Sequence, residues 1–93
     1  MDLSTTSSKI KVYSLPSCIY CQQLFEKLTE INLAFIRVNV SEHQQEFEAV
    51  VKHRGCSDLP MILVKDKLLI PEVSFRSITE AAVLTYKINK GLE

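Results

Sequence analysis

The first part of the chain changes from an alternating to a helical apolar pattern. In residues 10–13, Ile10 and Val12 share one face, which is typical of a strand that Pro16 ends. A helix is predicted next, because apolar residues recur at steps of three and four and form a stripe opposite a polar face. This helix is predicted to start near Cys18. The stripe consists of Cys21, Leu24, Phe25, Leu28 and Ile31.

A second alternating segment follows this helix. In residues 35–40, Ile36, Val38 and Val40 lie on one predicted strand face. Strand, helix and strand together form a unit of about 30 residues, which usually means two parallel strands joined by a right-handed crossover. The sequence therefore predicts an α/β fold class.

The next segment predicts a second helix and a hairpin. Ser41 and Gln44 have the spacing of a capping box, and Gly55 is placed to end the helix. The two short apolar runs 61–64 and 68–70 predict an antiparallel hairpin. The expected apolar stripe of the second helix is Phe47, Val50 and Val51.

A third helix is expected at the end of the sequence. Ser77 and Glu80 again have capping-box spacing, and Gly91 suits a helix C-terminus. Between them, an apolar stripe is expected on one face of the helix. It comprises Ala81, Leu84 and Ile88.

Composition limits the protein to one small domain. The chain has 93 residues, of which 46% are apolar and 24% charged, as in globular proteins. We expect residues 1–8 to be a loose lead and residues 9–93 a single domain, with neither a signal peptide nor a membrane span. Eleven basic and eleven acidic residues balance, so neither nucleic acid nor a membrane is the expected partner. A cytoplasmic monomer is predicted.

The cysteines carry the candidate chemistry. Cys18, Cys21 and Cys56 are too few, and odd in number, for a secreted disulfide framework. Cys18 and Cys21 lie where the first strand passes into the first helix, and residues three apart on a helix are close enough for a reversible disulfide. The helix N-terminus stabilises a thiolate, so Cys18 is predicted to have a low pKa and to attack. Cys21, on the apolar stripe, is predicted to resolve the mixed disulfide.

Two other interpretations of the cysteines stay open. A zinc site would combine the Cys18–Cys21 pair with His53 and Cys56, as two ligand pairs of tetrahedral geometry. Redox chemistry is favoured because the strand–helix–strand unit has enough apolar residues to fold without metal. Cys56 alone is either a small apolar filler or a regulatory thiol.

Two separated motifs together resemble the glutaredoxins of the thioredoxin superfamily. They are residues 12–21, VYSLPSCIYC, and residues 58–64, DLPMILV, and the resemblance extends over residues 9–84. It implies a thioredoxin-like fold with the order β-α-β-α-β-β-α. In this fold, four strands form a mixed sheet. The first two strands are parallel, the hairpin runs antiparallel to the first strand, and three helices lie on the two faces of the sheet.

The resemblance also implies a substrate site around the cysteines. The Leu59-Pro60 bond is expected to be cis and opposite the Cys18 sulfur, with the Leu59 backbone pairing with the substrate peptide. Tyr20 is expected to flank the substrate. The alternatives are that Pro60 simply starts a strand and that Tyr20 is an exposed aromatic residue.

Three positions depart from the family pattern for binding glutathione. Leu15 stands where glutaredoxins carry a Lys, so Cys18 is predicted to be less acidic than is typical of the family. Ile70-Pro71 replaces a Gly-Gly pair, and Val73-Ser74 replaces an Asp pair. Ser74 retains a hydroxyl that is a candidate contact for glutathione.

The sequence thus predicts a thiol–disulfide oxidoreductase that reduces protein disulfides or glutathione mixed disulfides, with glutathione as reductant and no metal. One alternative is a glutathione-independent redoxin that donates electrons to ribonucleotide reductase and is recharged by thioredoxin reductase. A non-enzymatic alternative is a metal-binding module. The resemblance also implies that Ile19, at a position that is usually Pro, permits an iron–sulfur cluster that bridges two chains.

Overall fold

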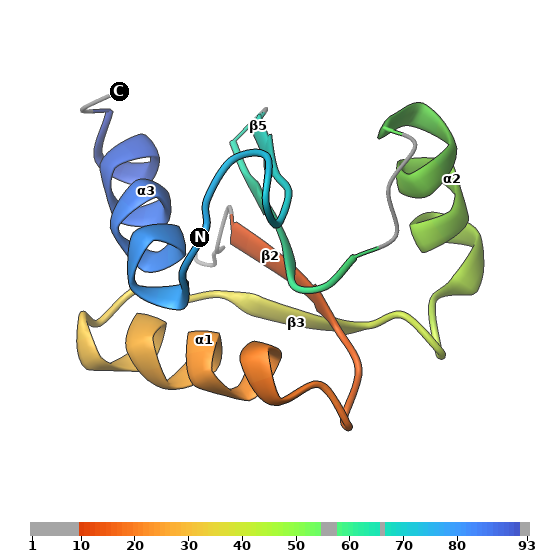
Figure 1. The fold of residues 1–93 in the computed structure, drawn as a ribbon, viewed down its shortest axis with the longest axis horizontal. Helices are drawn as coiled ribbons and strands as arrows, with labels where there is room; N and C mark the ends of the chain where they lie inside the picture. Colours follow the sequence, from red (N-terminus) through yellow and green to blue (C-terminus); the bar gives the residue numbers. More distant parts are fainter. Residues whose placement is uncertain (1–9, 55–57, 66, 92–93) are drawn as a thin grey trace, which may run out of the picture.

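The computed structural model describes residues 10–54, 58–65 and 67–91, which form one sheet with helices around it (Figure 1). The strands are hydrogen-bonded in the order β3-β2-β4-β5. The predicted α/β class and the order β-α-β-α-β-β-α are confirmed. The elements are β2 (Ile10–Ser14), α1 (Ile19–Glu30), β3 (Ile36–Asn39), α2 (Gln44–Arg54), β4 (Met61–Val64), β5 (Lys67–Leu69) and α3 (Ile78–Lys90).

Strand β2 lies in the middle of the mixed sheet. It pairs in parallel with β3, with Val12 next to Arg37, and antiparallel with β4, with Val12 next to Ile62. Strand β4 then pairs antiparallel with β5, as the predicted hairpin requires. The parallel pair is joined through α1, so β2 ends beside the start of a helix, and this junction carries the two cysteines.

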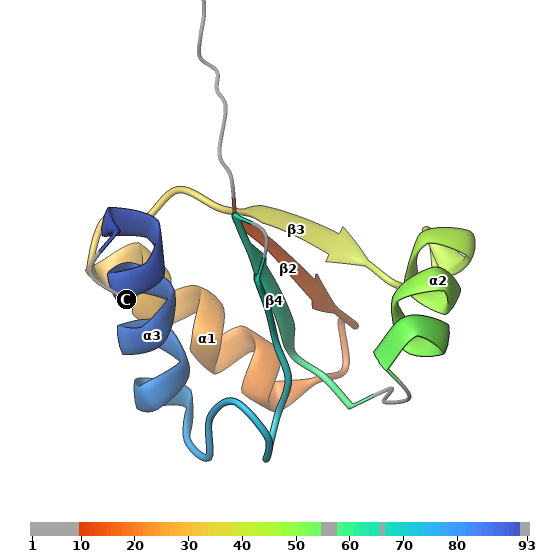
Figure 2. The same ribbon diagram turned by 90° about the horizontal axis from the view of Figure 1, so that it is seen from above.

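The helices lie on both sides of the sheet. Helices α1 and α3 lie side by side, whereas α2 follows the far end of β3 (Figures 1 and 2). Val12 belongs to the core cluster that includes Leu24 of α1 and Ala81 of α3. Tyr13, the next residue along β2, belongs to the opposite cluster, to which Phe47 of α2 is packed. The period of two in β2 therefore supplies both halves of the core.

Two residues of the predicted apolar faces lie at the surface of the structure. Ile31 is 40% exposed because α1 ends at Glu30 and Asn32 turns the chain with a φ of 60°. Ile36 is 44% exposed because β3 is an edge strand that the helices leave open at its start. Burial on this strand's predicted face is confined to Val38 and Val40.

The two predicted capping boxes have different outcomes. At α3, Ser77 Oγ accepts the N–H of Glu80 at 3.1 Å, and the Glu80 carboxylate accepts the N–H of Arg76 at 2.7 Å. At α2, the box at Ser41 is wrong, because Ser41 donates both its N–H and its hydroxyl to Oδ1 of Asn39, at 3.0 and 2.7 Å. Ser41 therefore takes part in an Asx turn with Asn39 at the end of β3 and does not cap α2. Gly55, the predicted helix end, lies outside the described residues.

A polar cluster links α2 to β2. Tyr13 donates its hydroxyl to Glu46 at 2.7 Å, and Lys11 reaches the same carboxylate oxygen at 3.3 Å. Phe47 and Val50 of α2 are only half-buried against the sheet. The hydrogen bond from Tyr13, followed by the bond and charge of Lys11, holds the pKa of Glu46 below its ordinary value.

Replacement of Glu46 by Gln is expected to lower the free energy of unfolding at neutral pH by about 1 kcal/mol. The value is modest because the Lys11 and Glu46 side chains are 41% and 38% exposed. A carboxyl whose pKa is lowered in the folded state stabilises above its unfolded pKa, and this contribution disappears as the pH falls through the folded pKa. Urea unfolding should therefore show the two proteins converging as the pH falls below the ordinary pKa of a glutamate. Glu48→Gln on the same helix is the matched control, and parallel curves for wild type and Glu46→Gln would contradict the assignment.

Candidate active site

Cys18 occupies the N-cap of α1, at the end of the short turn that follows β2. Its N–H donates to the carbonyl of Leu15 at 3.0 Å, which closes the turn. Its backbone is extended, with φ −83° and ψ 108°, and its Sγ accepts the N–H of Cys21 at 3.2 Å. The sulfur thus takes the capping position that a hydroxyl or carboxylate usually takes, at the positive end of the helix dipole. Both features favour a thiolate.

Cys21 lies one turn further along α1 and is fully buried in the core. The Cα atoms of the two cysteines are 5.2 Å apart, and their sulfur atoms are within disulfide-bonding contact. Cys18 is only half-buried. The pair therefore combines one partly exposed and one fully buried cysteine in a geometry that supports thiol–disulfide exchange.

The residues between the cysteines face solvent. Ile19 is 66% and Tyr20 60% exposed, although both are large and apolar. They lie on the first turn of α1, next to the half-buried sulfur. Exposed apolar surface beside a reactive group is typical of a contact surface for another molecule. The predicted role of Tyr20 in flanking a substrate is consistent with this position and stays a prediction.

The segment before β4 contains the cis bond that the family resemblance implied, whereas the expected position of Pro60 opposite the Cys18 sulfur stays a prediction. The Leu59-Pro60 bond is cis, and Pro60 is fully buried. Leu59 is half-buried and packs against both core clusters. Among the described residues, none makes a hydrogen bond to the backbone of Leu59. Within the described part of the chain its N–H and C=O are open to pairing with an extended peptide, while the predicted substrate contact itself stays a prediction.

The loop between β5 and α3 is closed by its own hydrogen bonds. The N–H groups of Val73 and Ser74 donate to the carbonyl of Ile70 at 3.2 and 2.8 Å, and that of Glu72 donates to Phe75 at 2.8 Å. Ser74 Oγ in turn accepts the N–H of Ile70 at 3.0 Å. The hydroxyl proposed for glutathione thus stabilises the loop, and its ligand role stays a prediction.

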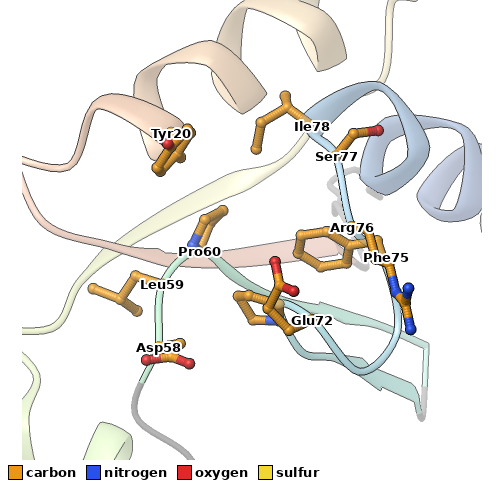
Figure 3. A pocket seen from close by; sticks show the side chains of 10 residues that line it. Tyr20, Asp58, Leu59, Pro60, Glu72, Phe75, Arg76, Ser77 and Ile78 are labelled. Carbon is orange, nitrogen blue, oxygen red and sulfur yellow. The ribbon is translucent and has the colours of Figure 1, made fainter.

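A pocket of about 360 Å³ lies between this loop, the Leu59-Pro60 segment and the start of α1 (Figure 3). Tyr20 and Ile78 face Pro60 and Phe75 across it. Its lining includes apolar residues from all three regions and three charged residues. The apolar members are Tyr20, Leu59, Pro60, Pro71, Phe75 and Ile78, and the charged members are Asp58, Glu72 and Arg76.

Sequence reasoning missed the two acidic residues of this pocket. Asp58 directly precedes the Leu59-Pro60 motif, so its proximity to the site was available from the sequence. Glu72 carried no such signal. It reaches the pocket because the loop gives it a left-handed backbone with φ 68°, a conformation that a glutamate rarely adopts.

The alternatives involving metal fall partly outside what the structure describes. Within residues 10–54, 58–65 and 67–91, no group of three or more His, Cys, Asp or Glu side chains is arranged to hold a metal ion. The side chain of His53 and the whole of Cys56 lie outside this part of the chain. The zinc site, the iron–sulfur cluster and the role of Cys56 therefore stay hypotheses. None of the described helices has the length and apolar character needed to cross a membrane.

Comparison with known proteins identifies relatives in sequence. Residues 10–69 match the family model of the glutaredoxins. An uncharacterized glutaredoxin-like 8.6 kDa protein in the rubredoxin operon of Clostridium pasteurianum is 31% identical over 61 residues, which are 66% of this chain and 81% of the relative. The segment matched by the family model includes both cysteines and the Leu59-Pro60 motif.

Solved structures match the fold over most of the chain. Glutaredoxin C1 from Populus tremula x tremuloides, in its holo form, superposes with a TM-score of 0.64 at 19% identity, covering 91% of this chain and 80% of that one. Oxidized glutaredoxin 2 from Chlamydomonas reinhardtii gives a TM-score of 0.61 at 18% identity, covering 90% and 78%. The predicted thioredoxin-like fold is confirmed.

Proposed function

The chain belongs to the glutaredoxin family, and on that premise we propose that it is a thiol–disulfide oxidoreductase whose working pair is Cys18 and Cys21. One observation carries the proposal: Cys18 is accessible at the N-cap of α1, and Cys21 is buried in contact with it. This arrangement supports a thiolate that attacks from outside and a second thiol that only the first can reach.

The reaction is a two-step exchange. The Cys18 thiolate attacks one sulfur of the substrate disulfide, which breaks the substrate S–S bond and releases one substrate thiolate. The Cys21 thiolate then attacks the Cys18 sulfur, forms the Cys18–Cys21 disulfide and releases the second substrate thiolate. Two electrons have passed from the protein to the substrate, and protons from solvent complete the two thiols.

The segment around Leu59 is proposed to hold the substrate. No described residue is hydrogen-bonded to the Leu59 backbone, so an extended peptide can donate to it and accept from it as a strand would. The exposed ring of Tyr20 offers an apolar surface on the opposite side of the pocket (Figure 3). These contacts position a substrate sulfur near Cys18 without a cleft between domains.

Glutathione is the proposed reductant, in a cytoplasmic monomer that acts on disulfide-containing proteins.

The closed loop favours a second candidate function, a redoxin that is recharged by thioredoxin reductase and has ribonucleotide reductase as one electron acceptor. The reason is that the amides of Glu72, Val73 and Ser74 all donate within the loop, and Pro71 has none. Few backbone donors of the loop are left for the carboxylates of glutathione.

One experiment tests the function and separates the two reductants. The oxidised full chain is incubated either with glutathione, glutathione reductase and NADPH, or with thioredoxin reductase and NADPH, and NADPH consumption is followed with a protein disulfide as acceptor. Turnover in the first system supports the glutaredoxin assignment, and turnover in the second alone supports the redoxin. Absence of turnover in both would contradict the proposal.

A lysine in place of Leu15 is expected to lower the pKa of Cys18. Leu15 belongs to the turn that the N–H of Cys18 closes, and a lysine ammonium extending from this turn through solvent is expected to stabilise the thiolate. For a solvent-screened charge, the expected decrease is about half a pH unit. Ultraviolet absorbance of the thiolate, followed as a function of pH in the reduced protein, measures it. Leu15→Gln is the uncharged control, and equal titration curves for the two variants would contradict the electrostatic explanation.

A further inference from the structure

The charged lining of the pocket between the start of α1, the Leu59-Pro60 segment and the loop before α3 has an excess of acid. Asp58 and Glu72 contribute two carboxylates, and Arg76 contributes one guanidinium. Within the described part of the chain, none of the three side chains makes an ion pair. In Figure 3 the Glu72 carboxylate points toward the space between Pro60 and Phe75, whereas the Arg76 side chain extends away from it.

The backbone of the loop places the Glu72 side chain at the pocket. Glu72 has a left-handed φ of 68°, and its N–H donates to the carbonyl of Phe75 at 2.8 Å. The bond between Ile70 and Ser74 Oγ closes the same loop. Because the loop backbone is already ordered, a cation that binds the carboxylate has to order only the Glu72 side chain, which lowers the entropy cost of binding.

The same pocket offers main-chain and apolar contacts for a polypeptide. The backbone of Leu59, next to Asp58, is unpartnered among the described residues. Pro60 and Phe75 supply apolar contact surface. An occupant that satisfies all of these groups is an extended peptide with a cationic side chain close to its disulfide.

We propose that this pocket selects disulfides whose cysteine is flanked by lysine or arginine, through Glu72 and Asp58. The inference rests on the proposed function, because it assigns a substrate class to the Cys18 site. Glutathione, with two carboxylates and one ammonium group, is a weaker occupant than a basic peptide. Selection by charge acts mainly on the rate of encounter and is reduced by salt.

The test uses three peptides that differ only in charge. Each carries one cysteine as a mixed disulfide with 2-thiopyridine, with Lys, Gln or Glu on both sides of the cysteine. The Cys18 thiolate attacks the peptide sulfur and releases 2-thiopyridone, Cys21 then releases the peptide thiol, and absorbance follows the first step. At low salt the reduced full chain is expected to react about fivefold faster with the Lys peptide than with the Glu peptide.

Variants assign this preference to the pocket. Glu72→Gln should reduce the Lys-to-Glu rate ratio by at least about half, and Glu72→Lys should bring it below one. Glu48→Gln, on α2, should leave it unchanged. Equal rates with the three peptides, or an unchanged ratio in Glu72→Gln, would overturn the proposal. If instead Cys18→Ser releases 2-thiopyridone as fast as wild type, the proposed function itself fails.

Discussion

Cys18→Ser is expected to decrease disulfide reduction by about a thousandfold or more, to the rate of the uncatalysed exchange. A hydroxyl at this position remains protonated at neutral pH, so the N-cap geometry that stabilises a thiolate no longer provides a nucleophile. Cys21 does not substitute for it because its sulfur is fully buried. The rate of reduction of a protein disulfide, with the reductant that restores the wild type, measures the loss.

The matched control is Ser17→Ala, which changes the neighbouring residue of the same turn and leaves both sulfurs in place. It is expected to retain most of the activity. A Cys18→Ser protein that still reduces disulfides at a rate near that of wild type would show that the nucleophile is another residue.

Cys21→Ser is expected to stop turnover on protein disulfides after the first step. The Cys18 thiolate still attacks, but no buried thiol lies in contact with its sulfur to release the product. A covalent adduct with the substrate should therefore accumulate, and steady-state reduction should fall by about a hundredfold or more. Mass spectrometry of the non-reduced protein detects the adduct and its attachment site.

Cys56→Ser, combined with Cys21→Ser, controls for attachment at the third cysteine. If glutathione is the reductant, Cys21→Ser should keep activity on glutathione mixed disulfides, because a second glutathione resolves the adduct. An adduct on Cys56, or full turnover without Cys21, would contradict the assignment of Cys21 as the resolving thiol.

Local periodicity was sufficient to predict most of the fold. The alternation around Val12 and the stripe containing Leu24 gave the correct strand and helix, because each pattern matches the face that is buried. Ile31 and Ile36 lie on predicted apolar faces but are exposed, since burial depends on where α1 ends and which strand forms the sheet edge. Neither property is local. The cap at Ser41 was wrong for a related reason, because Asn39 competes for the same hydroxyl.

The candidate site divides in the same way. The positions of Cys18 and Cys21 followed from their spacing and from the strand–helix junction, which are local features. The cis bond at Pro60 was implied only by family resemblance, since a sequence does not distinguish cis from trans proline. Glu72 was missed because a left-handed loop conformation brings it into the pocket, and no pattern in the sequence indicates that conformation.

The most direct test of the account is to determine which cysteines are oxidised as the redox potential changes. The full chain is equilibrated with dithiothreitol at graded ratios of reduced to oxidised reagent. Free thiols are then alkylated, and the masses of the tryptic peptides are measured by mass spectrometry. Cys18 and Cys21 share peptide 12–27, whereas Cys56 lies in peptide 55–65. We predict one two-electron transition, in which peptide 12–27 loses two hydrogens and both alkylation sites while peptide 55–65 stays alkylated. Full alkylation of Cys18 and Cys21 at every potential, or a disulfide between either of them and Cys56, would contradict it.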